Sequence, residues 1–88
     1  MQKDISEYMK RHIELLLDQT KSYQPFIKTA FPTTNMSDAC FNLIAANAFS
    51  VFLGQYAMRM IVPTQADFAE FGTLVSQYRE KINEIFAK

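Results

Sequence analysis

Residue types that could perform chemistry are scarce in this chain. Its 88 residues include one histidine, His12, and one cysteine, Cys40. A metal site needs several His, Cys or carboxylate ligands that converge, and nucleophilic catalysis needs a nucleophile, a base and an orienting group. A single histidine and a single cysteine cannot supply either set, and the sequence has no glycine-rich phosphate loop. We therefore expect no enzyme activity, no metal and no cofactor.

The charge balance restricts the possible partners. Nine basic and nine acidic residues give no net charge, and no basic run could neutralise a series of phosphates, so we expect no nucleic-acid partner. Cys40 cannot form an intrachain disulfide, and it lies in an apolar stretch where a reduced thiol behaves as a small hydrophobic group. The first residues lack the apolar core of a signal peptide. These features predict a cytoplasmic protein.

The elements that must position any functional residue centre on residues 39–61, which contain one charge, Arg59. Good helix formers and the absence of proline before Pro63 predict a helix here, from about residue 36 to 61, started by Asn35 or Ser37. Its apolar residues point in nearly every direction around the helix axis, whereas a surface helix has one apolar stripe. Most of its sides must therefore be covered.

Three covers are possible for this helix. The rest of the chain or a second copy could wrap it, or an apolar surface that is not protein could cover it. A bilayer is the third possibility, because the helix is long enough to span one. Asn42, Asn47, Gln55 and Arg59 make insertion costly, so we expect no transmembrane span.

The flanking segments have regular apolar periodicity. Residues 5–23 carry apolar side chains at three- and four-residue steps and predict a helix, with Asp4 as its N-cap and Glu7 in its first turn. Residues 65–87 predict a helix with a heptad-like seam, which suits either an internal contact or self-association with another chain. The seam consists of Phe68, Phe71, Val75, Tyr78, Ile82 and Ile85.

Prolines and glycines indicate the connections. Pro25 and Pro32 predict a non-helical connection over residues 24–36, which includes Thr33 and Thr34. Pro63 predicts a break, after which Thr64 serves as N-cap with Asp67 three residues later. Gly54 and Gly72 are isolated within predicted helices, which suggests close helix approach.

The fold that follows is one all-α domain over residues 1–88. Three helices, about 5–23, 36–61 and 65–87, form an antiparallel bundle or a helical hairpin. A chain of this length buries only about 60–65% of its unfolded surface, so we expect it to associate as a dimer or other homo-oligomer.

Residues 64–69, Thr-Gln-Ala-Asp-Phe-Ala, resemble the Thr-Gln-Ala-Glu-Phe type of tract that starts the last long helix of many phasins. Residues 55–59 and 78–81 are similar to the segments that flank this tract, and the resemblance extends over about residues 50–86. Phasins are small helical proteins that coat polyhydroxyalkanoate storage granules in bacteria. The resemblance implies a non-enzymatic, granule-associated protein that adsorbs through apolar helix surface and self-associates.

Two partners are therefore expected as alternatives, a hydrophobic polyester granule or a protein. In the second case the chain would be a small interaction module, an adaptor or inhibitor that docks through the helix at 36–61. The same apolar side chains could also be an ordinary core. The candidate binding residues are Phe41, Ile44, Phe49, Phe52, Leu53 and Tyr56.

Overall fold

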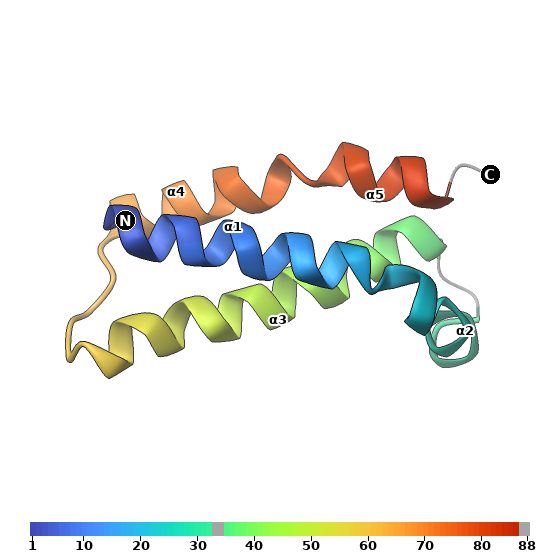
Figure 1. Ribbon diagram of the computed structural model, residues 1–88, viewed down its shortest axis with the longest axis horizontal. Helices are drawn as coiled ribbons and strands as arrows, with labels where there is room; N and C mark the ends of the chain where they lie inside the picture. Colours follow the sequence, from blue (N-terminus) through green and yellow to red (C-terminus); the bar gives the residue numbers. More distant parts are fainter. Residues whose placement is uncertain (33–34, 87–88) are drawn as a thin grey trace.

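Three helical rods lie side by side in the computed structural model, which describes residues 1–32 and 35–86 (Figure 1). The first rod is α1 (Lys3–Asp18), followed by α2 (Thr20–Ala30), which turns out of the line of α1 at one end of the molecule, and the second rod is α3 (Met36–Met58) (Figure 1). The third contains α4 (Gln65–Ser76) and α5 (Arg79–Phe86). The described residues contain no strand, so the all-α class is confirmed. Three helices were predicted, whereas the described residues form five.

The second rod runs opposite to the other two, and it packs against both (Figure 1). The apolar stripe of α1 faces inward, and its Ile5, Met9 and Ile13 are fully buried. The molecule measures 40 × 21 × 20 Å, so a single layer of side chains between the rods makes up the core. The rest of the chain contributes Ile27, Ile44, Phe52, Tyr56, Phe71, Leu74, Val75, Tyr78 and Ile82, of which Tyr78 lies between α4 and α5.

The first rod bends at Gln19 and then continues beyond its predicted end. At the bend the Leu16 carbonyl accepts hydrogen bonds from the Thr20 hydroxyl at 3.2 Å and from the Tyr23 hydroxyl at 2.9 Å. A hydroxyl bonded to the carbonyl four residues earlier tends to bend a helix. The predicted helix over 5–23 is therefore two helices joined at a bend.

The predicted non-helical connection at 24–36 is wrong as far as Ala30, because α2 passes through Pro25. Pro25 is exposed, so water can reach the carbonyl of Lys21 that loses its hydrogen bond. Ile27 is fully buried two residues later, and this burial favours continuing the helix. Thr33 and Thr34 of the same prediction lie outside the described residues.

The N-terminal cap of α1 also differs from the prediction. The N-cap is Gln2, whose side chain makes no capping hydrogen bond, and Asp4 lies within the first turn. The Asp4 carboxylate instead pairs with the Arg59 guanidinium at 2.8 Å, and that hydrogen bond lowers the pKa of Asp4. Asp4 therefore connects the start of α1 to the end of α3 rather than capping its own helix.

The predicted start of α3 and the predicted break before α4 are confirmed. The Asn35 side chain accepts the Asp38 N–H at 3.1 Å. Thr64 and Asp67 form a capping box, in which the Thr64 N–H donates to the Asp67 carboxylate at 2.8 Å and the Asp67 N–H donates to the Thr64 hydroxyl at 3.2 Å. The end of α3 is earlier than predicted, at Met58 instead of residue 61.

The third rod is interrupted between Ser76 and Arg79, where one continuous helix was predicted. The Tyr78 N–H donates to the Val75 carbonyl, three residues earlier, so the backbone tightens locally. The predicted end at residue 87 lies outside the described residues. A Cβ placed on Gly54 or Gly72 would meet no atom within 4 Å, so close helix approach does not explain either glycine and that prediction is wrong.

Candidate functional site

The single histidine and the single cysteine occupy structural positions. His12 Nε2 lies 2.7 Å from Asn47 Oδ1 and the His12 ring stacks on Tyr8, so this residue links α1 to α3. Cys40 is fully buried, and burial raises the pKa of its thiol, which disfavours the reactive thiolate. The described residues contain no group of three or more potential metal ligands. The candidate residues of α3 and of the third rod are considered next.

The six predicted binding residues of α3 separate into buried and exposed sets. Ile44, Phe52 and Tyr56 are at most 3% exposed, because the first and third rods cover that side of α3. They belong to the core and cannot contact a partner in this structure. Phe49 and Leu53 are exposed.

Phe41, the sixth residue of that set, is partly covered. The Arg79 guanidinium lies 3.9 Å from the centre of the Phe41 ring and also pairs with Asp38 at 2.9 Å. Phe41 is therefore engaged in contact with α5, where a cation above an aromatic face is favourable.

The predicted self-association seam faces the interior. Four of its residues are buried against the other rods, and one is half-buried. Of the two alternatives that the sequence left open, an internal contact or self-association, the seam makes the internal contact. Only its first residue is exposed. In order along the chain these residues are Phe68 (exposed), Phe71, Val75, Tyr78 and Ile82 (buried), and Ile85 (half-buried).

Aromatic rings from α3 and α4 form a continuous layer. The Phe52 ring centre lies 4.6 Å from that of Phe71 and 5.0 Å from that of Tyr56, inside the core. Phe49 and Phe68 lie on the outside of the layer with their ring centres 6.3 Å apart, and each is 41% exposed. The solvent-facing edge of this layer is therefore aromatic.

The last residue of α3 and the connection to α4 expose four large apolar side chains. Met58 is 78% exposed, Met60 92%, Ile61 40% and Val62 85%, and we refer to these four residues as the apolar turn. Sequence reasoning placed three of them in the helix and missed their exposure. The apolar run directly before the break at Pro63 could have indicated this exposure, because side chains at the end of a helical hairpin have few neighbours.

The backbone of the apolar turn has a defined geometry. Met60 has a φ of 57°, in the left-handed region that usually favours glycine. Its N–H donates to the Ala57 carbonyl at 3.0 Å, and the Ile61 N–H donates to the Tyr56 carbonyl at 3.1 Å, which together form a Schellman motif. A methionine at this position costs about 1–2 kcal/mol relative to glycine. Strained residues of this kind are often found at functional positions.

Most of the exposed large apolar residues lie on α3, on α4 or in the connection between them. Ten such residues are exposed in the described chain, and seven of them belong to α3, α4 or their connection. We call these seven the apolar end, and it includes the apolar turn. Its members are Phe49, Leu53, Met58, Met60, Ile61, Val62 and Phe68.

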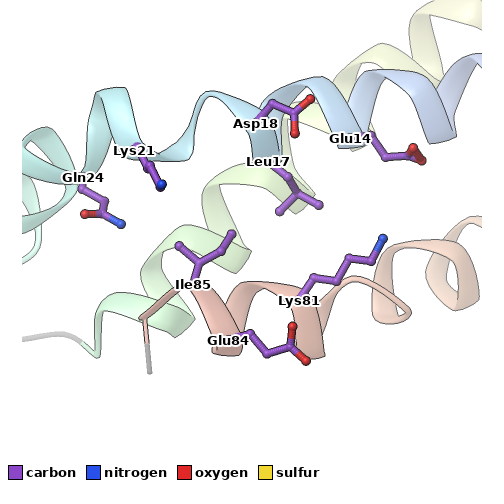
Figure 2. A pocket seen from close by; sticks show the side chains of 8 residues that line it. All are labelled: Glu14, Leu17, Asp18, Lys21, Gln24, Lys81, Glu84 and Ile85. Carbon is purple, nitrogen blue, oxygen red and sulfur yellow. The ribbon is translucent and has the colours of Figure 1, made fainter. Parts of the chain in front are cut away.

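Among several hollows on the surface, two that lie away from the apolar end are of interest. A cleft of about 660 Å³ between the first rod and α5 has Leu17 and Ile85 among its lining residues (Figure 2). The other residues that line it are polar, and three carboxylates and two lysines give it no clear preference for cations or anions. These residues are Glu14, Asp18, Lys21, Gln24, Lys81 and Glu84.

The second hollow is smaller and mostly apolar. It has a volume of about 260 Å³ and lies where α1, α2 and α3 meet. It is lined by Leu16, Tyr23, Phe26, Leu43, Ile44 and Asn47. Phe26 is 60% exposed, so the rim of this hollow also presents apolar surface.

By length and composition α3 could cross a membrane, a property that core helices of soluble proteins share. No protein-family model, curated protein or solved structure matches this chain. Its function is therefore argued from the geometry of its own residues.

Proposed function

We propose that this protein is a non-enzymatic, phasin-like structural protein that adsorbs to the surface of polyhydroxyalkanoate granules in the cytoplasm. One observation carries the proposal: seven of the ten exposed large apolar residues of the described chain belong to α3, α4 or their connection. A concentration of exposed large apolar side chains on one part of a small protein often marks a surface that contacts a partner. The proposed contact surface is therefore the apolar end.

This surface differs from the one inferred from the sequence. Phe49 and Leu53 remain in it, whereas Ile44, Phe52 and Tyr56 are core residues. Contact between these three residues and a granule would require the helices to separate, and the three side chains would lose their packing in the core. Adsorption through residues that are already exposed avoids this cost.

The energetics require several side chains to act together. Complete removal of one Met, Ile, Val, Leu or Phe side chain from water contributes about 1.5–3 kcal/mol. Immobilising a molecule costs about 4–15 kcal/mol. One exposed residue therefore cannot hold the protein on a polyester surface, but the combined burial of most of the apolar end can offset that cost.

The remaining surface suits a coat protein. The charged residues outside the apolar end would face water, and the zero net charge permits copies to lie next to one another without long-range repulsion. We propose that the three rods form an antiparallel bundle in solution and that copies of the chain associate, as expected for so small a domain.

The test is co-sedimentation with protein-free polyhydroxybutyrate particles. The variant carries Phe49→Asp and Leu53→Asp, which place charge at two exposed positions of the apolar end. The matched control carries Tyr8→Asp and Leu15→Asp on α1, where both residues are similarly exposed. We expect weaker adsorption for the first variant only, with circular dichroism confirming that both remain folded. Equal adsorption by the wild type and both variants would refute the proposal.

A protein-binding module is the second candidate, and the apolar hollow at Leu16, Tyr23, Phe26 and Leu43 favours it. A concave apolar site with a few polar groups is typical of sites that accept a partner side chain. This candidate predicts one stoichiometric protein partner whose binding is lost with Leu43→Asp. Retention on polyester with no such partner recovered from lysate would exclude it.

A further inference from the structure

We propose that the apolar turn enters the polyester first, so that the rods stand away from the granule with α2 at the water-facing end. This inference rests on the proposed function and adds an orientation to it. The apolar turn and α2 lie at opposite ends of the molecule, whose longest dimension is 40 Å (Figure 1). An end-on arrangement would allow many copies to pack on one granule.

The backbone of the apolar turn is suited to an apolar medium. A backbone N–H that enters such a medium without a partner is strongly disfavoured. The N–H groups of Arg59 and Met60 donate to carbonyls of the last turn of α3, and so does that of Ile61. Pro63 has no N–H to satisfy. Of the five backbone nitrogens from 59 to 63, three donate hydrogen bonds and one carries no hydrogen, so only the nitrogen of Val62 is left with a free N–H.

The one charged residue in this segment is drawn away from its tip. The Arg59 guanidinium donates to the Gln2 side chain at 2.7 Å and to the Asp4 carboxylate, both at the start of α1. The charge is therefore compensated by a partner on the neighbouring rod. Met60 and Val62, the most exposed residues of the turn, can enter an apolar phase without carrying an unpaired charge with them.

The geometry favours a polyester surface over a protein or an anionic membrane as the occupant. A stable protein interface uses about 20–30 residues and about 800 Å² per partner, whereas a turn of four projecting side chains supplies much less. Attraction to an anionic membrane needs clustered Lys or Arg, whereas Arg59 is paired with Asp4 and the N-terminal ammonium nearby is paired with Asp67 and Glu70. An uncharged apolar surface requires neither feature.

The experiment compares three double variants on polyhydroxybutyrate particles. The turn variant carries Met60→Asp and Val62→Asp, the side variant carries Phe49→Asp and Leu53→Asp, and the distal control carries Leu15→Asp and Phe26→Asp. All six positions are exposed, so each variant can fold, and circular dichroism verifies this.

We expect the turn variant to bind at least about tenfold more weakly than the wild type, because several side chains share the adsorption energy. The side variant should lose less, and the distal control should bind as the wild type does. A side variant that loses as much as or more than the turn variant would indicate side-on adsorption and overturn the inference. If the wild type itself fails to bind, the proposed function fails and the orientation fails with it.

A second measurement reports the orientation directly. An environment-sensitive dye is attached to Met60→Cys or to Phe26→Cys, while the buried Cys40 remains unlabelled under native conditions. On polyester we expect a blue shift of the emission from position 60 and none from position 26. A shift at both positions, or at position 26 alone, would overturn end-on insertion. Stronger binding to zwitterionic phosphatidylcholine vesicles than to polyester would overturn the assigned surface.

Discussion

Phe52 provides the sharpest test of which α3 residues are core and which are surface. Its side chain is fully buried, and its ring lies 4.6 Å from Phe71 and 5.0 Å from Tyr56. Replacement of a buried phenylalanine by alanine removes its transfer energy and leaves a cavity, so Phe52→Ala should cost about 3–5 kcal/mol. An 88-residue chain is stabilised by only roughly 4–13 kcal/mol, so this substitution should remove a large part of the folding free energy.

The matched control is Phe49→Ala, three residues earlier in the same aromatic layer but 41% exposed. We expect it to cost about 1–2 kcal/mol, because part of its ring already contacts water. Urea denaturation followed by circular dichroism measures both variants. With an m-value of roughly 1–3 kcal/mol/M, Phe52→Ala should lower the midpoint by at least about 1 M. Equal losses for the two variants would refute the division of α3 into core and surface residues.

Three further predictions concern stability. Gly54→Ala and Gly72→Ala should each stabilise the protein by about 0.5–1 kcal/mol, because the added methyl group meets no neighbour, and a lower urea midpoint would show that the space is not open. Tyr56→Phe should cost less than the control Tyr23→Phe, since the buried Tyr56 hydroxyl makes no hydrogen bond of normal geometry among the described residues, whereas Tyr23→Phe should lose about 1 kcal/mol with its bond to Leu16. Hydrogen bonds from the Thr64 N–H and the N-terminal amine lower the pKa of Asp67 from 3.8 to about 2, so Asp67 stabilises the fold above pH 3.8 and this contribution is lost as the pH falls towards 2. Acid titrations of the wild type and Asp67→Asn should differ in that range, and coincident curves would contradict the assignment.

Local signals were sufficient where one residue decides the structure. Pro63 removes a backbone donor, and the Thr64 and Asp67 side chains complete a capping box within three residues, so the break before α4 could be predicted from the sequence. Asn35 capped α3 for the same reason. In these places no distant contact competes with the local preference.

Tertiary contacts decided the places where prediction failed. Pro25 lies inside α2, where burial of Ile27 outweighs the lost hydrogen bond, and that burial depends on the position of α3. Asp4 left its expected capping role because Arg59, distant in sequence, lies beside it in the fold. Pairings of this kind have no signature in local spacing.

The candidate site was predicted only in part. The apolar sequence of α3 indicated a helix that is covered on many sides. Which of its residues remain exposed depends on where the first and third rods lie around it. Phe49 and Leu53 remain on the surface, whereas Phe52 and Tyr56 are buried and Phe52 packs on Phe71 of the third rod. Recognising the apolar turn required knowing where α3 ends, and the sequence placed that end at residue 61 instead of Met58.

The most direct test of the central claim is an adsorption isotherm of the purified wild-type protein on protein-free polyhydroxybutyrate particles. An unrelated soluble helical protein of similar size and charge provides the control. We predict saturable binding that persists at high salt, because burial of apolar surface rather than charge attraction drives it. Complete recovery of the protein in the supernatant, or binding no stronger than that of the control, would contradict the account.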